Sequence, residues 1–310
     1  MEYHTWFQSI GLLSVKERFS EINLIKGAQY LSWIILILVL FYIFKDGVVG
    51  ALICYLTSSI IGLILIFYTL SFSVKFMPSF SWSILQKSII FGFKGHIGNI
   101  IQFCNYRIDI LFVTYYLGAR EVGIYTMGVM ISESLWQIAS ATSSVLFPTT
   151  ATYQGSSNFT LKVQSVITAL TIFGSLLLII FGKPIINFFL SKSFIETYTV
   201  ILYLFPGIIS GTIAKIFAAD LVGRGYPWVG TIAAAAVIPL TVILNIIFIP
   251  IFGIIGAALT SSITYIINSI IITFYFMYLT KTSYKAILST LNPICWLLLY
   301  IANKEGQNTK

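Results

Sequence analysis

The sequence predicts an all-α, polytopic integral membrane helix bundle, and its composition indicates this class first. Hydrophobic residues make up 58% of the 310 residues and charged residues only 9%. The mean hydropathy is +0.94. A soluble domain carries about 25% charged residues, because polar side chains must cover its surface. The composition therefore disfavours a soluble enzyme, a nucleic-acid-binding domain and a disordered protein.

The second observation is the length of the apolar segments. A helix needs about 20 apolar residues to cross the bilayer core. Strands of a membrane barrel are shorter and alternate, which excludes them here. About nine transmembrane spans are expected, at residues 27–44, 47–72, 88–117, 122–147, 161–181, 195–218, 228–249, 253–279 and 286–302. The last is the weakest, and the longest polar connection is expected from Pro148 to Thr160.

The distribution of charge favours membrane orientation over nucleic-acid binding. The net charge is +8, but the bases stand singly between apolar runs. More of them lie on the side that holds the N-terminus, which predicts that this side is cytoplasmic. The three cysteines, Cys54, Cys104 and Cys295, lie in apolar stretches without metal-type spacing. We therefore expect no metal, no cofactor and no nucleic-acid partner.

An internal repeat predicts a two-lobe transporter. Residues 47–68 read GVVGALICYLTSSIIGLILIFY, and residues 253–275 read GIIGAALTSSITYIINSIIITFY. Each copy directly follows another span, and both begin on the same side of the membrane. This is the arrangement of parallel repeats. Counting the second copy, six spans follow the first, so the first lobe is expected to be incomplete, without its first four helices. Chance similarity of glycine-rich helix starts is the alternative.

The repeat divides the chain into five expected parts. Residues 1–26 are a cytoplasmic lead-in with the remnant of a preceding helix, and residues 27–75 are the last two helices of the N-terminal lobe. Residues 76–87 form a cytoplasmic linker, residues 88–280 a six-helix C-terminal lobe, and residues 281–310 an extra helix and a polar tail.

The span 88–117 differs from the others because it carries Lys94, His96, Asn99, Gln102, Asn105, Arg107 and Asp109. A charge at the bilayer centre costs about 3 kcal/mol on insertion scales. Arg107 and Asp109 are two residues apart and point in different directions, so their partners must come from other helices. Glu133 in the next span could pair with Arg107 or Lys94, or couple a proton. Two interpretations stay open: a hydrated central cavity, or ion pairs that fix helix packing.

The span 195–218 is predicted to make a close helix contact. Pro206 indicates a kink, and Gly207 and Gly211 allow a neighbouring helix to approach. Lys215, Asp220 and Arg224, near its cytoplasmic end, are interpreted as solvated charges that set orientation.

Enzyme motifs are absent from the sequence. It contains no G-x-S-x-G, H-E-x-x-H or G-x-x-x-x-G-K-[ST] pattern. No connection is large enough for the outer domain of a glycosyltransferase or sugar polymerase. We therefore expect a protein that is not an enzyme.

Two stretches of the sequence carry recognisable motifs. Residues 107–148 read RIDILFVTYYLGAREVGIYTMGVMISESLWQIASATSSVLFP, with the pattern R-x-D, then L-G, then E-V-G-x-Y, and residues 6–19 read WFQSIGLLSVKERF. These stretches resemble Wzx-type polysaccharide or O-antigen flippases, within the multidrug/oligosaccharidyl-lipid/polysaccharide exporter superfamily. Residues 6–19 resemble the region before the family's fifth helix, although Ser9 stands where the family has Gly.

The resemblance implies a function and a location. The chain is expected to be a multi-pass protein of the bacterial inner membrane that translocates a lipid-linked oligosaccharide for surface polysaccharide, O-antigen or lipopolysaccharide biosynthesis. The implied partners are an undecaprenyl-pyrophosphate-linked oligosaccharide, membrane lipid and other polysaccharide assembly proteins.

Roles for the polar residues follow from this expectation. Substrate-binding candidates are Arg107, Lys94, Asn99, Gln102, Asn105 and Gln137, and ion-coupling candidates are Asp109, Glu133 and His96. The alternatives are a lipid II flippase, a drug/cation antiporter, an inactive truncated remnant and a non-transporting membrane scaffold. An antiporter of cations favours acids over bases in its cavity, which this sequence does not show.

Overall fold

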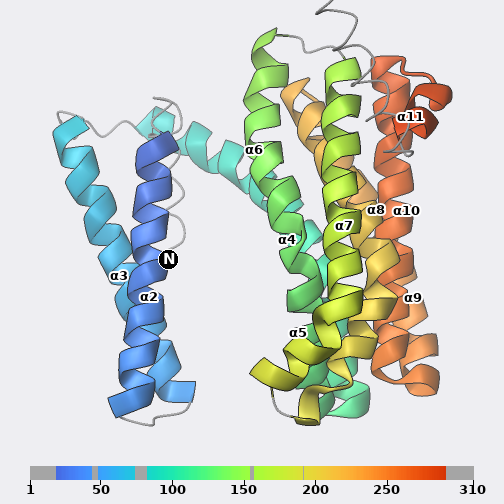
Figure 1. The fold of residues 1–310 in the computed structure, drawn as a ribbon. Helices are drawn as coiled ribbons and strands as arrows, with labels where there is room; N and C mark the ends of the chain where they lie inside the picture. Colours follow the sequence, from blue (N-terminus) through green and yellow to red (C-terminus); the bar gives the residue numbers. More distant parts are fainter. Residues whose placement is uncertain (1–18, 44–47, 74–81, 154–156, 191, 291–310) are drawn as a thin grey trace, which may run out of the picture. The chain divides into compact units, whose positions relative to one another are not determined.

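The computed structural model describes residues 19–43, 48–73, 82–153, 157–190 and 192–290. The described elements are all helical, which confirms the predicted fold class. They are α2 (Phe19–Ile43), α3 (Val48–Ser73), α4 (Trp82–Leu117), α5 (Ala119–Ser134), α6 (Trp136–Tyr153), α7 (Ser157–Phe189), η1 (Lys192–Phe194), α8 (Thr197–Gly223), α9 (Trp228–Phe252), α10 (Ile254–Thr280) and α11 (Tyr284–Thr290) (Figure 1). The chain divides into two compact units, Met1–Ile84 and Leu85–Lys310.

In the first unit, α2 and α3 pack against each other along their length. Gly62 of α3 lies so close to α2 that a Cβ atom there would be 3.0 Å from Gln29 Cδ. Cys54 and Ser58, on the same face of α3, are also buried. The opposite face is exposed and apolar, with Leu52, Ile53, Leu56, Ile60 and Ile64. A helix pair with such a surface suits a lipid environment.

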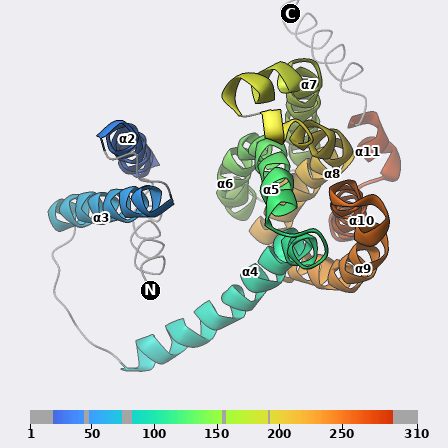
Figure 2. The ribbon, with the colours of Figure 1, turned by 90° about the horizontal axis from the view of Figure 1, so that it is seen from below.

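In the second unit, α8 is the central helix. It packs against α5, α6, α7 and α10, and α10 also packs against α9. The view along the bundle shows α8 enclosed by these neighbours (Figure 2). The largest buried side chains of the unit belong in good part to α8, including Ile201, Leu204, Ile208, Ile216, Phe217 and Leu221. The packing around α8 fixes the positions of the helices that carry the charged residues.

Glycines bring α8 close to its neighbours, as predicted. A Cβ atom at Gly207 would lie 2.6 Å from Ser262 Cα on α10, and one at Gly211 would lie 2.5 Å from Trp136 Cζ2 on α6. Pro206 lies inside α8, and a proline disturbs the helical hydrogen bonds around it. The amide of Gly207 donates a hydrogen bond of 2.8 Å to Ser262 Oγ. The contact therefore supplies a partner for the backbone next to the proline.

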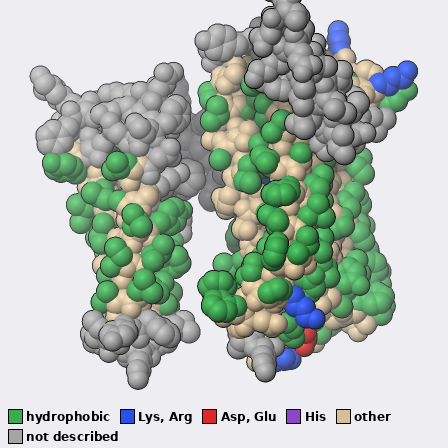
Figure 3. Space-filling view, viewed as in Figure 1, with side chains coloured by type: hydrophobic (Ala, Val, Ile, Leu, Met, Phe, Trp, Pro, Cys, Tyr) green, Lys and Arg blue, Asp and Glu red, His purple; other side chains and the backbone are tan. Residues whose placement is uncertain are grey.

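Four helices among the described residues, α7 to α10, are long and apolar enough to cross a membrane. They coincide with the predicted spans 161–181, 195–218, 228–249 and 253–279. Shorter apolar stretches cover Gly27–Val39 and Val49–Gly62. Figure 3 shows hydrophobic side chains along the length of the helices, and the charged side chains visible on this face lie toward the ends. The total of about nine spans stays a prediction.

Two segments differ from the sequence-based expectation, and a third is not tested. Residues 122–147, expected as one span, form two helices that meet at Leu135, whose amide bonds to Ser132 O in a tighter turn. The connection expected from Pro148 to Thr160 is largely helical in its described residues, because α6 extends to Tyr153 and α7 begins at Ser157. Of the weak span 286–302, residues 291–302 lie outside the described part of the structure, and the described residues 286–290 belong to α11.

The two repeat copies begin at equivalent places on their helices. Helix α3 begins at Val48 and α10 at Ile254, each one residue after the first glycine of the G-x-x-G-A sequence. Gly253 has a φ of 60° and joins α9 to α10 in a tight turn. A Cβ atom at Gly256 would lie 2.2 Å from Phe248 O, so the second glycine allows α10 to turn back directly against α9.

Candidate functional site

An ion pair joins α4 to α5 inside the second unit. Arg107 donates two hydrogen bonds to Glu133, from Nη1 to Oε1 at 3.3 Å and from Nη2 to Oε2 at 2.7 Å. The side chains are 34% and 16% exposed, respectively. Glu133 lies two residues before the helix break at Leu135. The sequence left Arg107 and Lys94 as possible partners of Glu133, and the structure places Arg107 in contact with it. The pair balances both charges in an apolar bundle.

Asp109 points to the other side of α4 and is 3% exposed. Its carboxylate accepts hydrogen bonds from the Tyr125 hydroxyl of α5, from Ser261 Oγ of α10 at 2.9 Å and from the amide of Ile110 at 2.8 Å. No Lys or Arg nitrogen of the described residues lies within ion-pair distance of it. The prediction that Arg107 and Asp109 find their partners on other helices is confirmed, with partners on α5 for both residues and on α10 for Asp109. Asp109 is thus held by hydroxyl groups instead of a cation.

The other predicted site residues are not all brought together. Gln102 is half-buried and lines a cavity. Asn105 is 3% exposed, and neither atom of its amide has a hydrogen-bond partner among the described residues. Gln137 is exposed on α6 and does not line this cavity. Lys94, His96 and Asn99 belong to α4, but their side chains lie outside the described part of the structure.

A lysine that sequence reasoning assigned to orientation occupies the interior. Lys215 Nζ lies 4.8 Å from the ring centroid of Trp136 and 5.6 Å from that of Tyr106. These two rings and that of Tyr265 contact one another, with centroids 5.2 to 5.5 Å apart. The interpretation of Lys215 as a solvated charge is therefore wrong, because aromatic faces hold its ammonium group by cation–π attraction.

The cavity beside Lys215 has a volume of about 310 Å³. It lies between α4, α6, α8, α9 and α10, and Gln102, Tyr106, Ser140, Ser143, Lys215 and Asn268 supply most of its polar lining. Lys215 of α8 therefore adds a cation to a cavity whose sequence-based candidates all came from the spans 88–117 and 122–147. One signal could have found it: Lys215 follows Gly207 and Gly211 at intervals of four residues, on the face of α8 that makes the close contacts.

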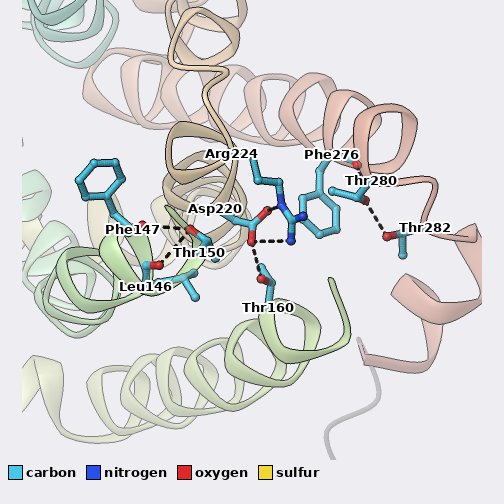
Figure 4. Close-up of polar contacts among 9 residues, drawn as sticks. All are labelled: Leu146, Phe147, Thr150, Thr160, Asp220, Arg224, Phe276, Thr280 and Thr282. Carbon is cyan, nitrogen blue, oxygen red and sulfur yellow. Dashed lines mark hydrogen bonds and ion pairs between the residues drawn. The ribbon is translucent and has the colours of Figure 1, made fainter. Parts of the chain in front are cut away.

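Asp220 also departs from its interpretation as a solvated charge, since it is 0% exposed. It accepts hydrogen bonds from Thr160 Oγ1 at 2.6 Å, from Arg224 Nε at 2.5 Å and from Arg224 Nη2 at 3.2 Å (Figure 4). Thr160 lies in the first turn of α7, and Arg224 directly follows α8. Asp220 thus ties the start of α7 to the end of α8, and Thr150 of α6 lies against Gly223 at the same end.

The family of the chain follows from a comparison with family models. The model described as "Polysaccharide biosynthesis protein" matches residues 8–199, more than half of the chain. The chain belongs to this polysaccharide biosynthesis family. The match covers α2 to α7 and thus both Arg107 and Glu133. It confirms the resemblance of the sequence to polysaccharide flippases, and with the apolar helices it makes the chain a multi-pass protein of the bacterial cell membrane.

Among solved structures, this family member is similar to the lipid II flippase MurJ in an inward closed conformation. The TM-score is 0.72 and the sequence identity 21%, over 95% of this chain. The chain spans 64% of the length of that MurJ chain. A comparison with curated proteins finds no match. The likeness shows that the fold is that of MurJ, a membrane transporter.

Proposed function

We propose that this chain acts in the translocation of a lipid-linked oligosaccharide across the bacterial inner membrane, for surface polysaccharide, O-antigen or lipopolysaccharide biosynthesis. Its substrate would be an undecaprenyl-pyrophosphate-linked oligosaccharide, and other polysaccharide assembly proteins would act with it. The observation that supports this proposal is the Arg107–Glu133 ion pair inside an apolar helix bundle of a polysaccharide biosynthesis family member. Charges at membrane depth are expensive, and functional pathways are where they are usually retained.

The ion pair suggests how binding and ion coupling are linked. The diphosphate of the substrate competes with Glu133 for Arg107, since a guanidinium binds carboxylates and phosphates with the same bidentate geometry. Protonation of Glu133 removes its charge and leaves Arg107 free for the diphosphate. Arg107 thus binds substrate and Glu133 couples a proton, with Asp109 and His96 as further coupling candidates.

The amides have a supporting role in this proposal. Gln102 lines the cavity, and the buried Asn105 has donor and acceptor groups without partners among the described residues. Both suit the hydroxyl groups of a sugar, which donate and accept hydrogen bonds. Lys94, Asn99 and Gln137 are also part of the proposed binding set, and only their positions in the sequence support this.

A lipid II flippase is the second candidate, and the likeness to the MurJ fold favours it. Lipid II also joins a sugar to a polyprenyl diphosphate, so the same ion pair would serve it. The two candidates differ in the phenotype of a gene deletion. Loss of lipid II transport stops growth, whereas loss of surface polysaccharide export removes the polysaccharide and leaves growth on rich medium.

The test is complementation of a deletion in the bacterium that carries the gene, with the full chain and its variants. We expect Arg107→Ala to abolish at least 90% of surface polysaccharide and to make the lipid-linked intermediate accumulate in the inner leaflet. Lys94→Ala should give a similar defect. Arg120→Ala is the matched control, because Arg120 is 65% exposed. Normal polysaccharide with both Arg107→Ala and Lys94→Ala, at equal protein levels, would refute the proposal.

A further inference from the structure

The turn after α10 places a lysine where helices usually carry glycine. Lys281 has a φ of 55°, in the left-handed region. Its amide and that of Thr282 both donate hydrogen bonds to Met277 O, and the hydroxyls of Thr280 and Thr282 lie 2.6 Å apart (Figure 4). Glycine is favoured at such a helix end because a Cβ atom makes this conformation unfavourable. An unfavourable conformation at a lysine indicates a use for its charged side chain.

Helix α11 places a second lysine shortly after this turn. The helix packs against α7, and Ile287 is 7% exposed in a cluster with Leu161 of α7 and Phe276 of α10. This packing fixes the orientation of α11, while Lys285, like Lys281, stays exposed. Figure 3 shows basic side chains that project from the end of the bundle where α11 lies. The turn and α11 therefore present two ammonium groups from a fixed support.

The described residues contain no acid that balances these two lysines. No Asp or Glu oxygen of that part of the chain lies within ion-pair distance of the ammonium group of Lys281 or Lys285. The carboxylate of Asp220, at the same end of the bundle, is already bound by Arg224. At the opposite end, two acids flank the base in the first turn of α5. The end that carries α11 therefore has positive charge to attract an anion.

The exposed face of α10 extends from these lysines toward the apolar part of the membrane. Ile270, Phe274 and Tyr278 follow one another at intervals of four residues and are 61%, 63% and 73% exposed. Tyr278 lies about one turn before Lys281. Exposed tyrosines of membrane helices gather at headgroup depth. A phospholipid fits both parts of this surface, because its phosphate suits the lysines and its acyl chain suits the apolar row.

We propose that Lys281 and Lys285 bind the headgroup of an anionic phospholipid, whose acyl chain lies along the exposed row of α10. The distribution of bases predicts that this end of the bundle is cytoplasmic, so the lipid belongs to the cytoplasmic leaflet. Basic residues at a membrane surface attract anionic lipids, by a factor of about five for each lysine. This lipid site is independent of the transported substrate, and it can be tested without any assay of transport.

The test is native mass spectrometry of the purified full chain, with dioleoyl phosphatidylglycerol as the anionic lipid and dioleoyl phosphatidylcholine as the lipid without net charge. We expect phosphatidylglycerol to bind about tenfold more tightly. The variant Lys281→Asn/Lys285→Gln should lose this preference, and it should keep the turn, since Asn adopts a positive φ more readily than Lys. Lys281→Arg/Lys285→Arg should retain the preference. Lys183→Gln is the matched control, because Lys183 is exposed toward the other end of α7.

Three results would overturn the lipid site. The first is equal affinity of the wild type for the two lipids, and the second is unchanged phosphatidylglycerol binding by Lys281→Asn/Lys285→Gln when it elutes as the same folded species. The third is an equal loss in Lys183→Gln, which would show that total charge alone attracts the lipid. Inorganic phosphate is the soluble probe: if it displaces phosphatidylglycerol at equal concentration, the lysines bind a free anion and the assignment to a lipid is wrong.

Discussion

Replacing Asp220 with Asn removes the carboxylate that ties α7 to the end of α8. Asp220 is 0% exposed and accepts one hydrogen bond from Thr160 and two from Arg224. An Asn side chain keeps one acceptor oxygen but places an NH₂ group against donors, and it removes the carboxylate charge that pairs with Arg224. Breaking a buried ion pair costs about 3–5 kcal/mol. Because the Arg224 side chain is 21% exposed and can turn toward water, we expect the lower end, about 3 kcal/mol.

For a unit of this size, each kcal/mol lowers the Tm by about 2–4 °C, so the expected decrease is about 6–12 °C. The assay is thermal unfolding of the full chain in detergent, followed by size-exclusion chromatography after heating. Arg120→Gln is the control, because exposed ion pairs contribute less than about 1 kcal/mol. In the double variant Asp220→Asn/Arg224→Gln the effects should be less than additive. A decrease below about 2 °C, or full additivity, would show that the pair does not stabilise the fold.

Two further substitutions test the packing around the charged residues, with the same thermal assay. Gly223→Ala places a Cβ atom 1.9 Å from Thr150 Oγ1 and should cost about 1–3 kcal/mol. Gly123→Ala, inside α5, has open space and should keep or slightly raise the Tm, because Ala favours the helix over Gly. Equal Tm values for the two variants would contradict the contact at Gly223. Tyr125→Phe removes the hydroxyl that donates to the buried Asp109 and should cost about 1–3 kcal/mol, which a wild-type Tm would disprove.

The sequence was sufficient for the fold class and for most helix positions, because bilayer thickness sets the length of a membrane-spanning apolar segment at about 20 residues. It also identified Arg107, Asp109 and Glu133, since a charge at membrane depth is rare and costly. Local geometry predicted that Arg107 and Asp109 point apart and take their partners from other helices, which the structure confirms. The choice of Glu133 as the partner of Arg107 needed the packing of α4 against α5, which no local pattern contains.

The break at Leu135 and the burial of Asp220 were not predicted, and the reasons are physical. At Leu135 no proline or glycine interrupts the sequence, and the turn depends on contacts such as the hydrogen bond from Trp136 Nε1 to Ile208 O, 2.8 Å long. Asp220 stands near the end of a span, where charges usually meet water. It is buried because Thr160 and Arg224 provide donors, and Thr160 lies 60 residues away in the sequence. Long-range partners of this kind cannot be inferred from one segment.

The buried face of α10 carries many small and polar residues, although large apolar side chains such as Ile208 and Phe217 of α8 are also buried in this bundle. On α10 the buried face carries Thr260, Ser261, Ser262, Thr264, Asn268 and Ser269, while Ile270, Phe274 and Tyr278 are exposed. Lipid is as apolar as a leucine side chain, so a membrane helix gains little by turning its large residues inward. Gly207 and Gly211 mark the inner face of α8 by the same rule, and Lys215 continues that row. A lysine on the inner row of the central helix therefore has its ammonium group against the rings of Trp136 and Tyr106, beside the cavity that it lines.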